Sequence, residues 1–121
     1  MLTTRQQGNK WENVAEKFLK RRGLKTLKKN FLVACGEIDL VMLDGQILVF
    51  TEVRYRRNIG HGSGAESVTW TKQRKIIRAA ELFLKNHPYH RFRPCRFDIV
   101  SIGIEDGEPI LDWIRGAFDA G

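Results

Sequence analysis

The hydrophobic positions along this chain follow two periods, one typical of helices and one typical of strands. Apolar residues recur at i, i+3, i+4 and i+7 over residues 9–22 and again over residues 71–86, a spacing that predicts two amphipathic helices. Apolar runs of strand length occupy residues 24–34, 38–43, 47–50, 95–104 and 110–114. The pattern therefore predicts the order α-β-β-β-α-β, with one further short strand at the C-terminus.

This order of elements predicts the class of fold. One helix before the strands and one between them favour an α/β domain, in which a central mixed β-sheet is covered by helices on both faces. A chain of 121 residues suits a single domain over residues 1–121, and the polar residues 1–8 are expected to be loose. The strand over residues 95–104 is apolar on both faces, which predicts burial on both, and Asp98 within it needs a polar partner.

The segment GEIDLVMLDGQILVFTEVRYRR, residues 36–57, predicts a β-hairpin. Its two apolar runs flank Asp44-Gly45, which is a strong short-range signal for a two-residue turn. A turn at this place would put Glu37 opposite Glu52 and make Asp39 a diagonal neighbour of Glu52. Side chains alternate between the two faces of a strand, so these three carboxylates are expected on one face, at the end of the hairpin far from its turn.

Such a cluster of carboxylates requires neutralisation, because like charges on facing strands destabilise a sheet. Arg54 lies on the same face and supplies one positive charge. A bound Mg²⁺ would supply two, and carboxylates are its preferred protein ligands. The alternative is an exposed hairpin edge whose acids pair with the neighbouring arginines.

The hairpin resembles a known catalytic motif. An acidic residue, a β-hairpin and then Glu-X-Lys on the next strand form the PD-(D/E)XK motif of restriction-endonuclease-like proteins. The segments GEIDL and VFTEVRYRR are similar to matching segments of the bacterial YraN family, which is related by motif to Holliday-junction resolvases. Asp39 matches the motif aspartate and Glu52 the motif glutamate, whereas Arg54 departs from the motif by replacing its lysine. The resemblance implies a restriction-endonuclease-like fold.

The resemblance also extends to the first predicted helix. Glu12 lies at the margin of the apolar stripe of this helix, and a glutamate near a helix N-terminus is more commonly solvated. However, WENVAEKFL resembles the first helix of the family, whose glutamate matches Glu12, and related nucleases carry an acidic residue there beside the metal. The expected ligands of Mg²⁺ or Mn²⁺ are Asp39, Glu52, the Val53 carbonyl and Glu12.

The charge of the chain points to polyanionic partners. Lys and Arg number 21 against 14 Asp and Glu, which gives a net charge of +7 and favours nucleic acid through counterion release. The alternative is a soluble basic protein without such a partner. Cations crowd the first half of the second helix, which is unfavourable to the helix dipole unless phosphates lie there. The expected nucleic-acid contacts are Arg56, Arg57, Lys72, Arg74 and Lys75. Lys72 and Gln73 also resemble the polar helix motif of resolvase-type nucleases, which implies a catalytic role for Gln73.

The cellular location is predicted from three absences in the sequence. Cys35 and Cys95 show no metal-ligand spacing, and two thiols in a chain of this size indicate a reducing compartment. No apolar run approaches the length of a membrane span, and the N-terminal residues lack the apolar core of a signal peptide. We therefore expect a cytoplasmic protein with no membrane partner.

Two functions follow from these observations. The first is a Mg²⁺- or Mn²⁺-dependent endonuclease that cleaves DNA, and the second is a nuclease-derived module that binds nucleic acid without cutting it. Phosphate contacts serve DNA and RNA alike, so only the resemblance favours DNA, and it also implies a resolvase-like homodimer. Arg54 is a poor general base because a guanidinium stays protonated, so its expected role is to stabilise phosphate charge or orient water.

Overall fold

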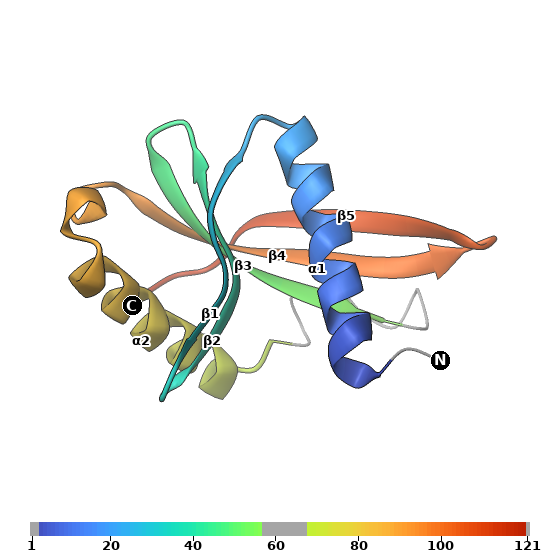
Figure 1. Ribbon diagram of the computed structural model, residues 1–121, viewed down its shortest axis with the longest axis horizontal. Helices are drawn as coiled ribbons and strands as arrows, with labels where there is room; N and C mark the ends of the chain where they lie inside the picture. Colours follow the sequence, from blue (N-terminus) through green and yellow to red (C-terminus); the bar gives the residue numbers. More distant parts are fainter. Residues whose placement is uncertain (1–2, 57–67, 121) are drawn as a thin grey trace.

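The computed structural model describes residues 3–56 and 68–120, which form a five-stranded sheet with helices on its two faces (Figure 1). The elements are α1 (Thr4–Arg21), β1 (Lys25–Val33), β2 (Gly36–Asp44), β3 (Ile47–Tyr55), α2 (Trp70–Asn86), the short 3₁₀ helix η2 (Pro88–His90), β4 (Cys95–Glu105) and β5 (Glu108–Phe118). The predicted order of elements is confirmed, and the additional C-terminal strand is present and longer than expected.

The sheet is mixed, and its strands follow one another in sequence order. Strands β1 to β5 are neighbours in turn, and each pair is antiparallel except β3 and β4, which are parallel. A parallel pair needs a crossover connection, and α2 lies within it. This five-stranded mixed sheet with two helices is consistent with the predicted restriction-endonuclease-like fold.

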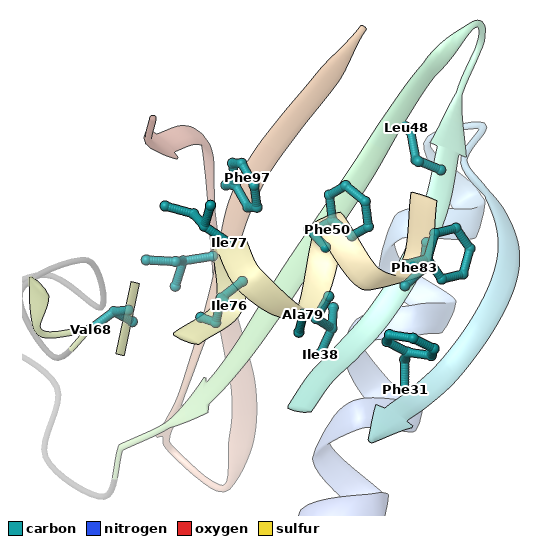
Figure 2. Packing of buried hydrophobic residues seen from close by; sticks show 13 residues of the cluster. Phe31, Ile38, Leu48, Phe50, Val68, Ile76, Ile77, Ala79, Phe83 and Phe97 are labelled. Carbon is teal, nitrogen blue, oxygen red and sulfur yellow. The ribbon is translucent and has the colours of Figure 1, made fainter. Parts of the chain in front are cut away.

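Each face of the sheet carries its own hydrophobic core. On one face, buried residues of α1 such as Leu19 pack against Leu40 and Val49, while on the other face Phe83 of α2 packs against Phe50 (Figure 2). Strand β4 contributes to both cores: Phe97 and Ile99 to the α2 side, Val100 and Ile102 to the α1 side. The predicted burial of this strand on both faces is therefore confirmed.

The N-terminal helix begins earlier than the hydrophobic pattern indicates. Thr3 Oγ1 accepts a hydrogen bond from the Gln6 backbone N–H at 3.1 Å, and Gln6 Oε1 accepts one from the Thr3 N–H at 2.8 Å. This reciprocal pair is a capping box, which satisfies free N–H groups of the first turn. The expectation that residues 1–8 are loose is therefore wrong for residues 4–8, which are helical.

The hairpin turn also differs from its prediction. Asp44 pairs with Ile47, so the two loop residues are Gly45-Gln46 rather than Asp44-Gly45. Gly45 has a φ of +60°, the left-handed conformation that glycine adopts without strain, as at the first loop position of a type II′ turn. The register of the two strands consequently shifts by two residues from the one predicted.

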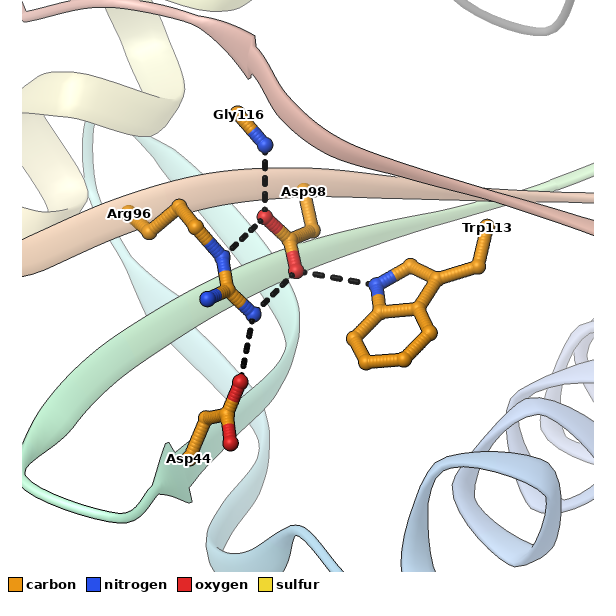
Figure 3. A network of polar contacts seen from close by, with 5 residues as sticks. All are labelled: Asp44, Arg96, Asp98, Trp113 and Gly116. Atoms are coloured by element: carbon orange, nitrogen blue, oxygen red, sulfur yellow. Dashed lines mark hydrogen bonds and ion pairs between the residues drawn. The ribbon is translucent and has the colours of Figure 1, made fainter. Parts of the chain in front are cut away.

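Asp98 is fully buried in β4, and its polar partners form the network in Figure 3. Its carboxylate accepts hydrogen bonds from Arg96 Nε at 2.9 Å and Nη2 at 3.0 Å, from Trp113 Nε1 at 2.9 Å and from the Gly116 backbone N–H at 3.0 Å. Arg96 also donates to Asp44 at 3.1 Å, and its hydrogen bonds to Asp98 raise the pKa of its guanidinium. Asp98 thus has the polar partner it needs, and the network joins β4 to β5 and to the hairpin.

Candidate metal centre

Strands β2 and β3 separate from each other at Asp39. Their antiparallel pairing ends at Leu40 and Thr51, whereas β2 stays paired with β1 and β3 stays paired with β4 as far as Tyr55. Figure 1 shows β1 and β2 running together away from β3. In the gap so formed, Asp39 Oδ2 accepts a hydrogen bond from the Val53 backbone N–H at 2.8 Å. The Asp39 carboxylate thus accepts the hydrogen bond that a backbone carbonyl of a paired strand would otherwise accept. Because the pairing has ended before this point, the predicted pairing of Glu37 with Glu52 is wrong.

A change of face accompanies this separation. Asn30, between the β1 residues that pair with Leu40 and Ile38, has a φ of +53°. Leu40 packs in the core beneath α1, but Ile38, two residues earlier, packs in the core beneath α2. Strict alternation would place both on one face. Asp39 therefore lies at the twist, where it can approach residues from both layers of helix.

Three carboxylates meet on the α1 side of the gap. Glu12 of α1 and Glu37 and Asp39 of β2 each offer an oxygen, and these oxygens lie within 4.8 Å of one another. Glu12 and Glu37 line a pocket of about 460 Å³ together with Asn30. Among the described residues, Glu12 Oε2 is buried without a hydrogen-bond partner. A buried, unpartnered acceptor facing two further carboxylates matches the oxygen-only ligand sets of Mg²⁺ and Mn²⁺.

Glu52 forms the fourth member of what we call the carboxylate centre, namely Glu12, Glu37, Asp39 and Glu52. Its side chain is 6% exposed, and its Oε1 lies 3.6 Å from Arg54 Nε and 3.7 Å from Lys72 Nζ. Asp39 is within hydrogen-bonding reach of Glu52 as well as of Glu12. Asp39 thus lies between the carboxylate of Glu12, on the α1 side, and the carboxylate of Glu52, which Arg54 and Lys72 approach.

Burial makes three of these carboxylates, Glu12, Asp39 and Glu52, difficult to ionise together. It raises the pKa of Glu12 to about 7 and that of Glu52 to about 8, and the nearby charge of Asp39 adds to both shifts. Burial also raises the pKa of Asp39, against the opposing hydrogen bond from the Val53 N–H. Shifts of this kind collect at functional sites, where a ligand or a reaction later changes the charge. A divalent cation would stabilise the ionised forms of these three groups.

Lys72 reaches the centre because of how α2 begins. Thr69 Oγ1 accepts a hydrogen bond from the Lys72 backbone N–H at 3.2 Å, which fixes the first turn of the helix. The helix lies so close to β2 that a Cβ added to Gly36 would come 3.4 Å from the backbone oxygen of Lys75. The sequence predicted Lys72 as a phosphate contact within a polar helix motif, not as a partner of Glu52. Its ion pair with Glu52 was missed because it depends on this tertiary packing.

The other expected ligands and catalytic residues lie as follows. The N–H and C=O of a strand residue point to the same neighbouring strand, so the Val53 carbonyl faces the side on which Asp39 lies. The Gln73 side-chain amide donates to the Val68 carbonyl at 3.0 Å, at the start of α2. Its catalytic role stays a prediction. Glu37 was not among the expected ligands, although its position two residues before Asp39 in the same strand was a usable signal.

The expected nucleic-acid contacts are spread around the centre. Arg74 lies 5.8 Å from the Trp70 ring and donates to the Ala120 carbonyl at 3.3 Å, while Lys75 is exposed. Arg56 is half-buried, and its backbone N–H donates to the Ile102 carbonyl at the end of β3. Arg57 lies outside the described residues. Whether any of them binds phosphate stays a prediction.

Aromatic residues are close in the sequence to residues of the centre. Trp70, the first residue of α2, is 72% exposed two positions before Lys72. On the α1 side, the rings of Trp11 and Tyr55 stack with their centroids 4.4 Å apart. Exposed flat rings beside a charged centre can support the bases or sugars of a bound nucleic acid.

The mixed sheet, with its helix on each face and its carboxylates gathered where two central strands separate, defines a protein of restriction-endonuclease-like fold. The chain belongs to the UPF0102 family: the sequence model described as "Uncharacterised protein family UPF0102" matches residues 11–102. These residues include the whole carboxylate centre and Lys72. UPF0102 is the YraN-like family that the sequence motifs predicted, so this prediction is confirmed.

Bacterial relatives match almost the full length of the chain. A UPF0102 protein of Pseudomonas syringae pv. syringae is 48% identical over 120 residues, which cover 98% of both chains. One from Pseudomonas aeruginosa is 47% identical over 98% of this chain and 96% of its own, and one from Xanthomonas oryzae pv. oryzae is 50% identical over 95% and 93%. In the described part of the chain, neither α-helix is long and apolar enough to cross a membrane.

Proposed function

We propose that this protein is a Mg²⁺- or Mn²⁺-dependent endonuclease that hydrolyses phosphodiester bonds in DNA, and that it acts in the cytoplasm. The observation that carries the proposal is the convergence of Glu12, Glu37 and Asp39 within 4.8 Å, next to the buried Glu52. Structural acids on a sheet edge need no such arrangement, because they can turn toward water. These acids instead come from two elements, α1 and β2, and converge with their oxygens close together.

The residues of the chain fit the proposed metal. Asp39, Glu52, the Val53 carbonyl and Glu12 would hold it, and Glu37 would complete the oxygen ligands. When bound, such an ion lowers the pKa of a coordinated water and stabilises negative charge on the scissile phosphate. The hydrogen bond from the Val53 N–H holds Asp39 in place and leaves its other oxygen available as a ligand.

Lys72 and Arg54 take different roles in this proposal. Both approach the same oxygen of Glu52, so both lie where the phosphate of a substrate would meet the carboxylate centre. The planar guanidinium of Arg54 stays protonated and suits a fixed interaction with phosphate oxygens. Lysine carries a compact ammonium on a flexible stem, and that of Lys72 lies 3.7 Å from Glu52. Lys72 therefore takes the place of the motif lysine that Arg54 replaces.

The basic residues around the centre would hold the substrate without reading its sequence. Arg56, Arg74 and Lys75 carry charges suited to phosphate oxygens, and such contacts position a nucleic acid. The choice of DNA over RNA, and a resolvase-like homodimer, rest on the resemblance to Holliday-junction resolvases.

One observation favours the alternative, a binding module without catalysis. Arg54 and Lys72 already supply two positive charges to Glu52, so part of the cluster is neutralised by the chain itself. In that case the acids would fix the first turn of α2 against β3, and only the basic surface would contact nucleic acid.

A cleavage assay tests the proposal. Wild type, Asp39→Asn and Glu81→Gln would be incubated with junction, flap, linear duplex and single-stranded DNA in Mn²⁺. Glu81 is an exposed glutamate of α2 and controls for loss of a carboxylate elsewhere. The proposal expects cleavage by wild type and Glu81→Gln and none by Asp39→Asn. Absence of cleavage of every substrate by wild type would favour the binding module.

A further inference from the structure

Two aromatic side chains project from the surface at the end of α2 that is farthest from the carboxylate centre. Tyr89 is 85% exposed and Phe92 is 86% exposed. Both belong to residues 87–94, HPYHRFRP, which we call the aromatic loop; it connects α2 to β4 and contains η2. Figure 1 shows η2 beyond the C-terminal end of α2. At 1.5 Å per residue, the 17 residues of α2 place this loop about 25 Å from the turn that carries Lys72.

The exposure of these rings does not result from a loosely held loop. The His87 ring stacks on Phe83 with centroids 4.0 Å apart, and its Nδ1 lies 2.8 Å from the Phe83 carbonyl oxygen. Arg93 Nε donates to His90 Nδ1 at 2.9 Å, and Arg93 Nη1 donates to Gln46 Oε1 in the hairpin loop at 2.7 Å. The inward side chains therefore anchor to the core and to the hairpin the loop that carries the two outward rings.

Each exposed ring has a guanidinium beside it. Arg93 Cζ lies 5.7 Å from the centroid of Tyr89, and Arg91 Cζ lies 4.7 Å from that of Phe92. The loop contains no acidic residue. A hollow of about 300 Å³ lies between the hairpin loop and the rings, and it is lined by Gln46, Tyr89, Phe92, Arg93 and Pro94. The surface thus combines flat apolar faces with positive charge in a preformed recess.

The exposed rings, the neighbouring arginines and the recess together indicate which class of ligand this surface can bind. Unpaired nucleotides offer flat bases that stack on aromatic rings and phosphates that arginine neutralises, whereas a duplex keeps its bases stacked inside. We infer that the aromatic loop binds single-stranded nucleic acid, with bases stacked on Tyr89 and Phe92 and phosphates beside Arg91 and Arg93. The inference shares with the proposed function only its class of ligand, nucleic acid, and it requires neither a bound metal nor cleavage.

The position of the loop also specifies the substrate of the proposed endonuclease. The distance of about 25 Å corresponds to roughly seven base pairs at the duplex rise of about 3.4 Å per base pair. A substrate that contacts both sites would place its scissile bond at the carboxylate centre and an unpaired segment at the aromatic loop. Flaps and branched DNA with unpaired arms meet this requirement, but an intact linear duplex does not.

Binding of two labelled probes in EDTA tests the inference. The probes are a 5′-fluorescein oligothymidylate and a duplex of the same length, followed by fluorescence anisotropy. Tyr89→Ala/Phe92→Ala should weaken binding of the single strand by about tenfold or more, with its salt dependence unchanged, because stacking is not ionic. Affinity for the duplex should stay within about twofold. Ile110→Ala, an exposed apolar residue of β5, should bind both probes as wild type does.

Further variants separate stacking from charge. Tyr89→Phe keeps the ring and should retain single-strand affinity, whereas Arg91→Ala should lower the salt slope by about 0.7, the value for one phosphate contact on a single strand. Unchanged single-strand affinity in Tyr89→Ala/Phe92→Ala would overturn the inference. The inference would also be overturned if that variant alone lost self-association or binding to phosphatidylglycerol vesicles but kept its binding of oligothymidylate.

The outcomes distinguish this inference from the proposed function. If wild type cleaves no DNA but Tyr89→Ala/Phe92→Ala still loses single-strand affinity, the endonuclease proposal fails and the inference stands. If that variant binds and cleaves every substrate as wild type does, the inference fails and the endonuclease proposal stands.

Discussion

Lys72 Nζ lies 3.7 Å from Glu52 Oε1, the same oxygen that Arg54 Nε approaches to 3.6 Å. Glu52 comes from β3 and Lys72 from the first turn of α2, so the pair joins the central sheet to the helix that covers it. The chain thereby presents a lysine to the buried glutamate, although arginine occupies the motif position on β3. The two cations differ in chemistry, and their replacement should therefore have different effects.

The first prediction concerns Arg54. If it stabilises phosphate charge by electrostatics, Arg54→Ala should lower the single-turnover cleavage rate by about a hundredfold to a thousandfold, the usual cost of losing one preorganised charge. Arg54→Lys keeps the charge and should retain or increase the rate. Single-turnover kinetics at fixed Mn²⁺ and salt measure both. Equal rates for the three proteins would exclude a catalytic role for Arg54.

The second prediction concerns Lys72. Lys72→Met keeps most of the aliphatic chain but removes the ammonium, so it should leave the helix intact and lower cleavage at least as strongly as Arg54→Ala. Lys72→Arg should not restore the rate, because a planar guanidinium does not fit the space beside Glu52 that a compact ammonium occupies. Lys85→Met, an exposed residue in the last turn of the same helix, is the matched control. Recovery of the wild-type rate with arginine would show that only charge matters at this position.

The third prediction concerns pH and the stability of the metal-free protein. The folded protein holds the pKa of Glu52 at about 8 and that of Glu12 at about 7, above an ordinary value of 4.5. The folded state therefore binds more protons than the unfolded state at intermediate pH, and stability falls as pH rises. The melting temperature in EDTA should be highest near pH 5 and should decrease through pH 8.

Variants of the carboxylate centre provide the control for this pH dependence. Glu52→Gln cannot ionise, so its melting temperature should decrease less between pH 5 and pH 8 and should exceed that of wild type at pH 8. Asp39→Asn should also stay folded. Glu81→Gln should follow the wild-type curve. A wild-type melting temperature that rises across this range would show that these carboxylates ionise freely in the folded protein.

The fourth prediction concerns the salt dependence of DNA binding. Arg74→Ala/Lys75→Ala removes two cations from α2 and should reduce the magnitude of the log–log salt slope on duplex DNA by about 2. Adding Lys72→Ala should bring the reduction to at most about 3. Lys17→Ala/Arg21→Ala, on the exposed side of α1, is the control. A slope that the α2 variants leave unchanged would rule out this helix as a phosphate contact.

The sequence predicted the fold well because the fold depends on local periodicity. Helical spacing and apolar strand runs determined the order of elements, and the turn signal at residues 44–45 located the hairpin. The exact loop was wrong by one residue, since Gly45 can serve at either position of a two-residue turn. A shift of the loop by one residue moves the register of the two strands by two residues, so the cross-strand partner of every residue in the hairpin differs from the predicted one. The start of α1 was missed because Thr3 and Gln6 stabilise it without contributing to the apolar stripe.

The carboxylate centre was predictable only in part. Asp39, Glu52 and Arg54 follow from the motif, and Glu12 from the resemblance of the first helix. The ion pair of Lys72 with Glu52 depends on the docking of α2, which no local pattern specifies. The separation of β2 from β3 at Asp39 is likewise a tertiary feature, linked to the left-handed conformation of Asn30. For the same reason no local pattern indicated that Trp70 would be exposed.

The most direct test is calorimetric titration of Mn²⁺ into the metal-free protein. The central claim is that Asp39 and its neighbouring carboxylates form a metal site, and the claim predicts saturable binding to wild type. Asp39→Asn should abolish this binding while its melting curve shows a folded protein, and Glu81→Gln should bind as wild type does. Absence of saturable binding to wild type, or undiminished binding to Asp39→Asn, would contradict the claim.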